Sequence, residues 1–293
     1  MGLAENNLRL LLEAKARHGV SLTRTATLGR QELFVGENAL RGILQSFGYS
    51  LSEAECADLV HRDRGFAESL LTYLGAEEVR SFDVSDYEGA TDLHDFNARV
   101  DPELHGEFDL VFDSGTLQHI FFATTALENC MKMVRVGGHL IVMSPANNRL
   151  GHGFYQFSPE FYFRSLTAEN GFEICRASVF EGHADPVWYD VVDPATIGGG
   201  SEAATRRPTT VAVVARKAAE LPLFAQPPQQ TLYAEAWKTP GPLVQRRHRP
   251  LVQAARGYIP DSSRSFYRWA RSLLSRRRYA SAMFSPRRVP PDG

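Results

Sequence analysis

The sequence predicts an α/β domain built on a doubly wound, mostly parallel sheet, and three observations support this prediction. Predicted strands alternate with predicted helices over most of the chain, which is typical of strand–helix–strand crossovers. The run Phe108–Phe112 is almost continuously apolar, as expected of a strand that helices cover on both faces. The 293 residues are 43% apolar and 23% charged, an ordinary globular composition that excludes a wholly disordered or fibrous chain.

Apolar residues recur at helical spacing in four segments, and the run Ser158-Pro159-Glu160 has the signals of a fifth helix start. A glycine follows each of the five segments as a stop signal. The predicted helices cover residues 8–18, 40–47, 66–74, 125–136 and 159–170. Six short runs rich in apolar or β-branched residues predict strands. These strands cover residues 22–28, 79–84, 108–112, 139–143, 172–180 and 209–215. Thr125 and Glu128 have the spacing of a capping box at the start of the fourth helix.

Charge and composition divide the chain into four parts. We expect an N-terminal helix over 1–21, the α/β domain over 22–217, a Pro- and Gln-rich linker or arm over 218–244, and an arginine-rich tail over 245–293. The tail contains 12 arginines, no lysine and two aspartates, so it carries +10. Because the net charge of the whole chain is −2, the preceding 244 residues carry −12. This asymmetry predicts a basic extension on an acidic body.

The tail contains one possible amphipathic helix. Phe266, Trp269 and Leu273 share a helical face, and arginines occupy the other faces. Three interpretations stay open for the tail: a solubilising arm, a contact with an acidic membrane surface or a protein, and a contact with nucleic acid. The aromatic residues favour a membrane or protein partner over nucleic acid.

Other features limit the compartment and the chemistry. No apolar stretch is long enough to span a bilayer, and no secretory signal is visible. Cys56, Cys130 and Cys175 lie far apart, which argues against a disulfide scaffold or a zinc site. We therefore expect a cytoplasmic protein without a metal site. The serine-hydrolase, P-loop and HExxH motifs are absent from the sequence.

Candidate ligand contacts follow the predicted strands, because open parallel sheets bind ligands at the carboxyl ends of their strands. Asp83 ends its strand, and its two carboxylate oxygens match the two hydroxyls of a ribose, although an ordinary turn also fits. Asp95 and Phe96 offer a carboxylate for the amine of an adenine and an apolar ring to cover it. The alternative for this pair is a solvated loop.

The next candidates follow the strand 108–112. Asp113, Ser114 and Gly115 make a small polar turn in which the backbone can approach a ligand closely. His119 lies just beyond, where a general base would be placed. The alternatives are that Asp113 or Ser114 caps the following segment and that His119 is a structural histidine.

The order of these features resembles the class I S-adenosylmethionine-dependent methyltransferases. The resemblance covers Leu22–Lys217 and includes the acid at Asp83, the loop at Asp95, “Phe-Asp-Leu-Val-Phe-Asp-Ser-Gly-Thr-Leu-Gln-His” and “Val-Gly-Gly-His-Leu-Ile-Val-Met”. A bacterial subgroup with a degenerate glycine-rich first motif is similar in “Leu-Gly-Arg-Gln”, “Ser-Asp-Tyr-Glu-Gly-Ala” and “Gly-His-Gly-Phe-Tyr-Gln-Phe-Ser-Pro-Glu”. The resemblance implies a seven-stranded Rossmann-like fold whose two late strands form an antiparallel pair. It also implies methyl transfer from S-adenosylmethionine to an oxygen or nitrogen of a small molecule, a sugar or a glycan precursor.

The resemblance also implies cofactor contacts from the ends of three strands and from the loop at Asp95. Asp83 would hold the ribose, and the guanidinium of Arg30 could form a two-pronged pair with the cofactor's carboxylate. The full set of implied cofactor residues is Gly29, Arg30, Gln31, Asp83, Asp95, Phe96, Asp113, Ser114 and Gly115.

The first motif departs from the family pattern, because Gly29 is the only glycine after the first strand and no acid accompanies it. Gly29 also precedes Asp83 by 54 residues, farther than dinucleotide-type folds usually allow. A rival register makes Cys56–His61 the first strand and Gly65 the loop glycine. We favour the Gly29 register, because 53–58 looks helical, and we keep Glu68 as a possible pocket residue.

The loop 144–158 follows a strand at the ligand-binding edge and is dense in glycine, aromatic and hydrogen-bonding residues. We interpret it as the wall of the acceptor site, with Asn147, Tyr155 and Gln156 as contacts, while packing on the core is the alternative. His152 or His119 could remove a proton from the acceptor. A catalytically silent binding or scaffolding protein on the same fold is the second hypothesis. A nicotinamide oxidoreductase is a poorer third, because the GxGxxG turn is absent.

Overall fold

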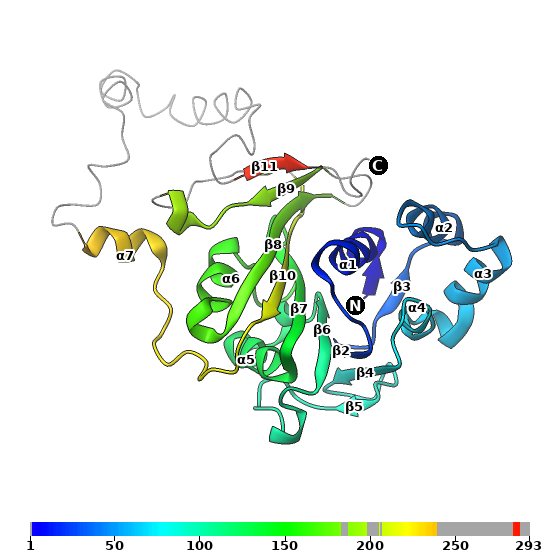
Figure 1. Cartoon of the computed structure of the whole chain (residues 1–293), viewed down its shortest axis with the longest axis horizontal. Coiled ribbons are helices and arrows are strands. Elements are labelled where there is room, and N and C mark those ends of the chain that lie inside the picture. Colours follow the sequence, from blue (N-terminus) through cyan, green and yellow to red (C-terminus); the bar gives the residue numbers. More distant parts are fainter. Residues whose placement is uncertain (1, 183–186, 198–204, 206, 239–283, 288–293) are drawn as a thin grey trace, which may run out of the picture.

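The structure is a computed structural model that describes residues 2–182, 187–197, 205, 207–238 and 284–287. Its centre is a nine-stranded sheet in the order β5-β4-β2-β6-β7-β10-β8-β9-β11 (Figure 1). These strands are β2 (Arg24–Leu28), β4 (Glu78–Asp83), β5 (Asp92–Leu93), β6 (Phe108–Ser114), β7 (Val134–Asn147), β8 (Phe172–Glu181), β9 (Trp188–Val191), β10 (Thr209–Lys217) and β11 (Phe284–Arg287). A second sheet pairs β1 (Gly2–Ala4) with β3 (Glu32–Phe34). The helices are α1 (Glu5–His18), α2 (Glu37–Ser46), α3 (Glu53–His61), α4 (Glu68–Tyr73), α5 (Ala123–Met133), α6 (Pro159–Ser165) and α7 (Thr231–Trp237).

The large sheet is mixed and has more strands than the expected seven. β5, β4, β2, β6 and β7 are parallel to one another. From β7 onwards, through β10, β8 and β9 to β11, every pairing is antiparallel. β10 lies between β7 and β8, so the predicted antiparallel pairing of the two late strands is confirmed. β9 and β11 then extend the sheet beyond β8, where the sequence contains no strand signal that we identified.

Helices cover both faces of the sheet, which confirms the doubly wound α/β prediction. In Figure 1, α1–α4 lie on one side of the sheet and α5 and α6 on the other. Each face has its own buried apolar cluster, with Leu11 and Leu40 on the first side and Met131 and Tyr162 on the second. The carboxyl ends of the five parallel strands therefore meet at one edge, between two packed layers.

The Gly29 register is correct. β2 ends at Leu28 and pairs in parallel with both β4 and β6. The rival strand over 56–61 belongs to α3, which a Ser52–Glu55 capping box starts. The interval between β2 and β4 contains the three helices α2, α3 and α4, whereas the sequence predicted two helices there, over 40–47 and 66–74.

The boundary between α5 and β7 differs from the prediction. The predicted capping box at Thr125 and Glu128 is wrong, because α5 begins at Ala123 and no side chain caps it. β7 starts immediately after α5, so the glycines that follow the helix lie inside the strand. A Cβ on Gly138 would lie 2.8 Å from the carbonyl oxygen of Asp109, so this glycine permits a close approach between β7 and β6.

α1 is fastened to the sheet by a buried ion pair. The carboxylate of Glu13 contacts the guanidinium of Arg176 on β8, and both side chains are almost fully buried. Arg176 also contacts Asp190 of β9 at 3.2 Å and lies 5.4 Å from the ring centre of Trp188. Because two buried charges need each other, this pair fixes where α1 crosses the sheet.

Most of the predicted tail lies outside the described residues, including the amphipathic helix predicted around 266–273. Its described part is β11, and the predicted linker over 218–244 contains α7. Among the described residues, no helix combines the length and the apolar character that crossing a bilayer requires.

Candidate functional site

The sheet brings several sequence-predicted residues together at the carboxyl ends of its parallel strands. Gly29 follows β2 with a φ of +71°, and its N–H donates to the carbonyl of Phe82 on β4 at 2.7 Å. On the other side, the hydroxyl of Thr116 donates to the carbonyl of Leu28 at 2.6 Å. The turn after β2 therefore touches the ends of both neighbouring strands.

The side chains of Gln31 and Arg30 support this turn. The amide of Gln31, which is 3% exposed, donates to the carbonyls of Leu28 at 2.7 Å and Gly29 at 3.2 Å. Arg30 contacts Glu68 at 2.7 Å and lies 4.0 Å from the ring centre of Phe66. Glu68 is thus a partner of the predicted site residues. Nη1 of Arg30 also donates to the carbonyl of Glu88 at 3.0 Å, so a two-pronged pair with a ligand would compete with these internal contacts.

Asp83 and Asp95 lie on neighbouring loops. Asp83 is partly exposed, and its Oδ1 accepts a hydrogen bond from the N–H of Ser85 at 3.2 Å. The N–H of His94 donates to the carbonyl of Asp83 at 2.8 Å, which holds the two loops together. Asp95 is exposed, and hydrogen bonds from Asn97 lower the pKa of its carboxyl. Both carboxylates can be reached by a ligand.

Phe96 points into the protein rather than to the surface. Its side chain is 4% exposed and packs edge-on against Phe82, with the ring centres 6.3 Å apart. His94 packs against its other side with a ring-centre distance of 5.0 Å. Phe96 therefore supports the loop that carries Asp95, and His94 offers the more accessible ring there.

Asp113 is the most unusual ionisable group at this edge. Its carboxyl is fully buried, and its Oδ1 accepts the N–H of Thr116 at 2.6 Å, whereas Oδ2 has no partner within the described chain. Burial is the largest influence and raises the pKa of Asp113 to about 7, while the hydrogen bonds oppose it. The carboxyl caps the following turn, as one of the sequence interpretations expected.

Ser114 connects β6 to the N-terminal strand. Its hydroxyl donates to the carbonyl of Gly2 at 2.9 Å, and the amide of Asn7 contacts the same hydroxyl. Gly115 follows with a φ of +96°, and its carbonyl accepts the amide of Gln118 at 2.6 Å. The N-terminus is therefore part of the predicted site, which the sequence analysis missed because no local pattern joins Gly2 to Ser114.

Gln118 joins the Gly115 turn to the loop after β7. Its side chain is 2% exposed, and its backbone carbonyl accepts the N–H groups of Phe154 at 2.7 Å and Tyr155 at 3.3 Å. A Cβ on Gly153 would lie 2.6 Å from that carbonyl oxygen, so only glycine permits this contact. The sequence analysis missed Gln118, although it directly precedes the candidate base His119.

His119 and His152 lie side by side although 33 residues separate them. Their ring centres are 4.8 Å apart and their planes nearly perpendicular. Loss of hydration lowers the pKa of His119, and the neighbouring His152 lowers it further. The amide nitrogen of Gln118 lies 3.5 Å from Nε2 of His152. A neutral imidazole at this position can accept a proton.

The three predicted acceptor contacts mainly hold the loop in place. Asn147 donates to the hydroxyl of Thr205 at 2.9 Å. The hydroxyl of Tyr155 donates to the carbonyl of Phe121 at 2.6 Å. The side-chain oxygen of Gln156 accepts the N–H of Arg149 at 2.9 Å. The loop is therefore preorganised by its own polar side chains.

A cavity of about 440 Å³ lies between these elements. Its walls come from the N-terminal segment, the end of β6, β7 and its loop, and β8 with β10. The polar and charged residues that line it are Glu5, Asn6, Asn7, Ser114, Gln118, Ser144, Arg149, His152 and Thr210. Of the sequence-predicted residues, only Ser114, Gly115 and His152 line this cavity. Gly29, Asp83 and Asp95 lie along the same edge but outside it.

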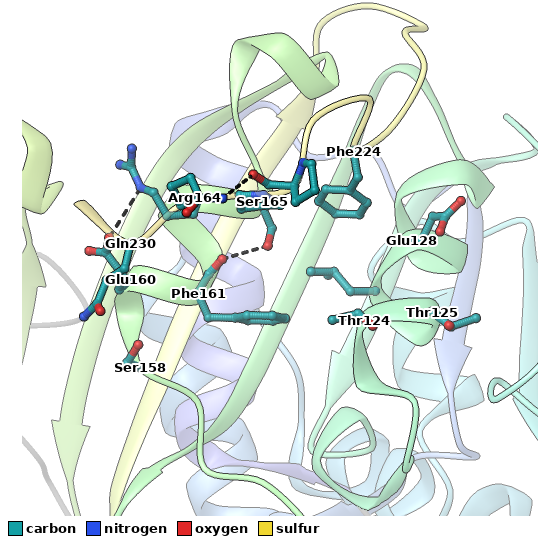
Figure 2. A pocket seen from close by; sticks show the side chains of 14 residues that line it. Thr124, Thr125, Glu128, Ser158, Glu160, Phe161, Arg164, Ser165, Phe224 and Gln230 are labelled. Carbon is teal, nitrogen blue, oxygen red and sulfur yellow. Dashed lines mark hydrogen bonds and ion pairs between the residues drawn. The ribbon is translucent and has the colours of Figure 1, made fainter. Parts of the chain in front are cut away.

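A larger cavity of about 610 Å³ lies between α5, α6 and the segment 224–230. Figure 2 shows that Phe161 and Phe224 face this cavity. Its charged groups are paired with neighbours: Arg164 contacts Glu160 and Asp193, and Glu128 contacts Lys132. None of the sequence-predicted site residues lines it. Within the described residues, no group of three or more histidine, cysteine or acidic side chains could hold a metal ion.

Comparison with known proteins gives distant structural similarities. No protein-family model and no curated protein sequence matches the chain. Several of the similar solved structures are methyltransferases. The N-methyltransferase NodS from Bradyrhizobium japonicum WM9 is 11% identical, covers 73% of this chain and 97% of its own, and has a TM-score of 0.38. The trans-methyltransferase CalH in complex with S-adenosylhomocysteine (SAH) is 15% identical, with coverages of 73% and 57% and a TM-score of 0.35. The [4+2]-cyclase SpnF is also 15% identical, with coverages of 74% and 81% and a TM-score of 0.40. At these identities and scores the assignment of function depends on the site itself.

Proposed function

We propose that the protein is an S-adenosylmethionine-dependent methyltransferase that acts on an oxygen or nitrogen of a small molecule, a sugar or a glycan precursor. The main support is the single edge at which five parallel strands end. That edge carries acids after β4 and β5, the one-glycine turn after β2, and the polar turn after β6. The antiparallel β10 between β7 and β8 adds support, because the methyltransferase resemblance implies this pairing.

The residues on this edge fit the nucleoside half of the cofactor better than its methionine half. Asp83 presents a partly exposed carboxylate for the ribose, and Asp95 presents an exposed one for the adenine amine. His94, whose N–H donates to the carbonyl of Asp83, has a buried ring nitrogen, Nε2, without a partner in the described chain. For the methionine half, Gly29 has a positive φ at the end of β2, but Arg30 is paired with Glu68. The bound cofactor would supply an electrophilic methyl group on a sulfonium.

The chain's own contribution to the transfer is alignment and, where the acceptor needs it, removal of a proton. Methyl transfer requires the acceptor atom and the methyl carbon in line, which a preorganised pocket provides. His119 and His152 form a pair beside the cavity, and loss of hydration lowers the pKa of His119, which favours its neutral form. Either imidazole can take the proton of an acceptor hydroxyl or amine. Residues of the segment 2–7 line one side of the cavity.

Two observations favour the second hypothesis of a silent binding or scaffolding protein. Arg30 has internal partners, and the carbonyl of Gly2 is hydrogen-bonded to Ser114 at the end of β6. In that case the arginine-rich tail would supply a membrane or protein contact. We propose the cytoplasm as the compartment under both hypotheses, on the grounds of the dispersed cysteines.

Isothermal calorimetry with S-adenosylmethionine and SAH, using NADH as a control ligand, tests the proposal. We expect saturable binding of both cofactor forms to the full chain and at least about a tenfold loss of affinity in Asp83→Ala, because a ribose hydroxyl pair loses its charged acceptor. Asp86→Ala is the matched control, since Asp86 is an exposed acid in the same turn. Absence of binding at millimolar cofactor contradicts the methyltransferase proposal and favours the silent one.

A further inference from the structure

Arg149 follows β7 and stands out among the arginines near the site. Its backbone N–H is held by Gln156 at 2.9 Å, its side chain is half-buried, and it lines the 440 Å³ cavity. Within the described chain, its guanidinium has no ion pair, hydrogen bond or aromatic partner. Arg30 and Arg164, which lie elsewhere around the sheet, both contact acids.

A half-buried cation without a counter-charge is unfavourable, because burial removes water that an internal partner does not replace. Such a group is therefore a candidate for binding a charged ligand. Glu5 is the single acid among the residues that line the cavity, and it makes no ion pair with Arg149. His152, Asn7, Ser144 and Thr210 add hydrogen-bonding groups to the walls. The cavity can thus accept an anion at Arg149 while a polar group faces Glu5.

We propose that the acceptor carries a carboxylate or phosphate and that Arg149 binds this group. A guanidinium can form two parallel hydrogen bonds with either anion, which fixes orientation as well as position. This proposal rests on the proposed function, because the bound molecule is an acceptor only if the protein transfers a methyl group. Arg149 and His152 line the same cavity, so an anion on Arg149 places the rest of the molecule near the candidate base. The acids proposed for the cofactor follow β4 and β5, on the far side of β2 and β6 from Arg149.

Titration with inorganic phosphate, without cofactor, tests the anion site directly. The 12 arginines of 245–293 also attract phosphate, so the measured signal must be local. We would follow the imidazole carbon-bound protons of His152 by NMR, assigned with His152→Gln, at constant ionic strength. We expect a saturable shift with millimolar phosphate and none with chloride. A His152 signal that does not respond to phosphate overturns the proposal.

Three variants locate the anion. In Arg149→Gln the shift is expected to be lost, and in Arg149→Lys it is expected to persist with weaker affinity, because lysine keeps the charge but not the fork. Arg99→Gln is the control, since Arg99 is an exposed arginine that, like Arg149, has no partner among the described residues but lies outside the cavity. A phosphate response that survives in Arg149→Gln overturns the assignment to Arg149.

Ligand pairs separate the acceptor from the cofactor. Ribose 5-phosphate should shift the His152 signals at lower concentration than ribose, and 4-hydroxybenzoate at lower concentration than phenol. SAH and 5′-methylthioadenosine, which lacks the amino-acid carboxylate, are titrated in the same variants. If Arg149→Gln weakens SAH but not methylthioadenosine, the anion is the cofactor's carboxylate and the acceptor proposal is wrong. If SAH does not bind while phosphate still requires Arg149, the methyltransferase proposal fails and the anion site remains.

Discussion

Asp113 should make the protein less stable as the pH rises, and Asp113→Asn should remove that effect. The carboxyl is fully buried at the end of β6, and its Oδ2 has no partner among the described residues. Burial raises its pKa from 3.8 to about 7, against the opposing hydrogen bonds from Thr116 and Leu117. The folded protein therefore keeps a proton on Asp113 over a pH range in which the unfolded chain has released it.

The sign and size of the effect follow from this difference in proton binding. Where the folded state binds more protons than the unfolded state, the free energy of unfolding falls as the pH rises. The contribution of Asp113 is complete below its unfolded pKa of 3.8 and is lost progressively until the pH reaches about 7. At about 1.4 kcal/mol per pH unit, Asp113 should remove about 2.5 kcal/mol between about pH 5 and about pH 8.

Urea unfolding followed by circular dichroism at several pH values measures this effect. Asp113→Asn keeps an oxygen for the N–H of Thr116 but cannot ionise. The unfolding free energy of the variant minus that of the parent should therefore grow by about 2.5 kcal/mol from about pH 5 to about pH 8. Burial lowers the pKa of His139 to about 4, so this residue makes the protein less stable as the pH falls, which is opposite to the effect of Asp113. The effect of His139 is present in both proteins and cancels in their difference.

The control is Asp86→Asn, which changes an exposed acid and should give a difference that does not vary with pH. If Asp113→Asn also gives a difference independent of pH, the carboxyl of Asp113 is ionised in the folded protein. Burial would then not outweigh the hydrogen bonds that this carboxyl accepts.

Two further predictions concern the loop after β7 and the position of α1. Gly153→Ala should lower the unfolding free energy by about 1–3 kcal/mol and weaken acceptor binding, because the new Cβ would meet the carbonyl oxygen of Gln118 at 2.6 Å from a backbone with φ of +77°. Gly151→Ala, which meets nothing within 4 Å, should leave urea unfolding almost unchanged, and equal effects of the two changes would contradict the proposed contact. Glu13→Gln should lower the unfolding free energy by about 3 kcal/mol in the same assay, because the buried guanidinium of Arg176 loses this charged partner. Glu235→Gln, in an exposed pair, should cost less than about 0.5 kcal/mol, and a similar small cost for Glu13→Gln would show that this pair does not fasten α1.

Elements with a strong local pattern could be predicted from the sequence. The leucines of α1 and the glycine after it mark a helix whose ends agree with the structure to within a few residues. The apolar run at Phe108 predicts β6 because a strand covered on both faces needs no polar alternation. The carboxyl ends of β2, β4 and β6 follow from such runs, so the predicted placement of Gly29, Asp83 and Ser114 along one edge is confirmed.

Contacts between distant segments could not be predicted in this way. Glu68 is 38 residues from Arg30, and its role as a partner depends on how α4 packs against the turn after β2. Gln118 meets Gly153 because two loops from different strands end at the same edge. β1 and β9 are three and four residues long, too short to show a periodic pattern, and they form only because a partner strand is available.

Contacts from the neighbouring chain explain why the turn after β2 has a single glycine. Gln31 fills the inside of the turn with hydrogen bonds, and Arg30 ties its outside to α4. The following residues form β3, which pairs with β1 and so brings Gly2 to Ser114. A glycine-rich loop here would lack the side chains that fasten the turn, which leads directly into β3, the only partner strand of β1 among the described residues. The turn is therefore less flexible than a glycine-rich loop, and the N-terminal strand next to it forms one wall of the cavity. Any ligand that reaches Ser114 through the cavity contacts that wall.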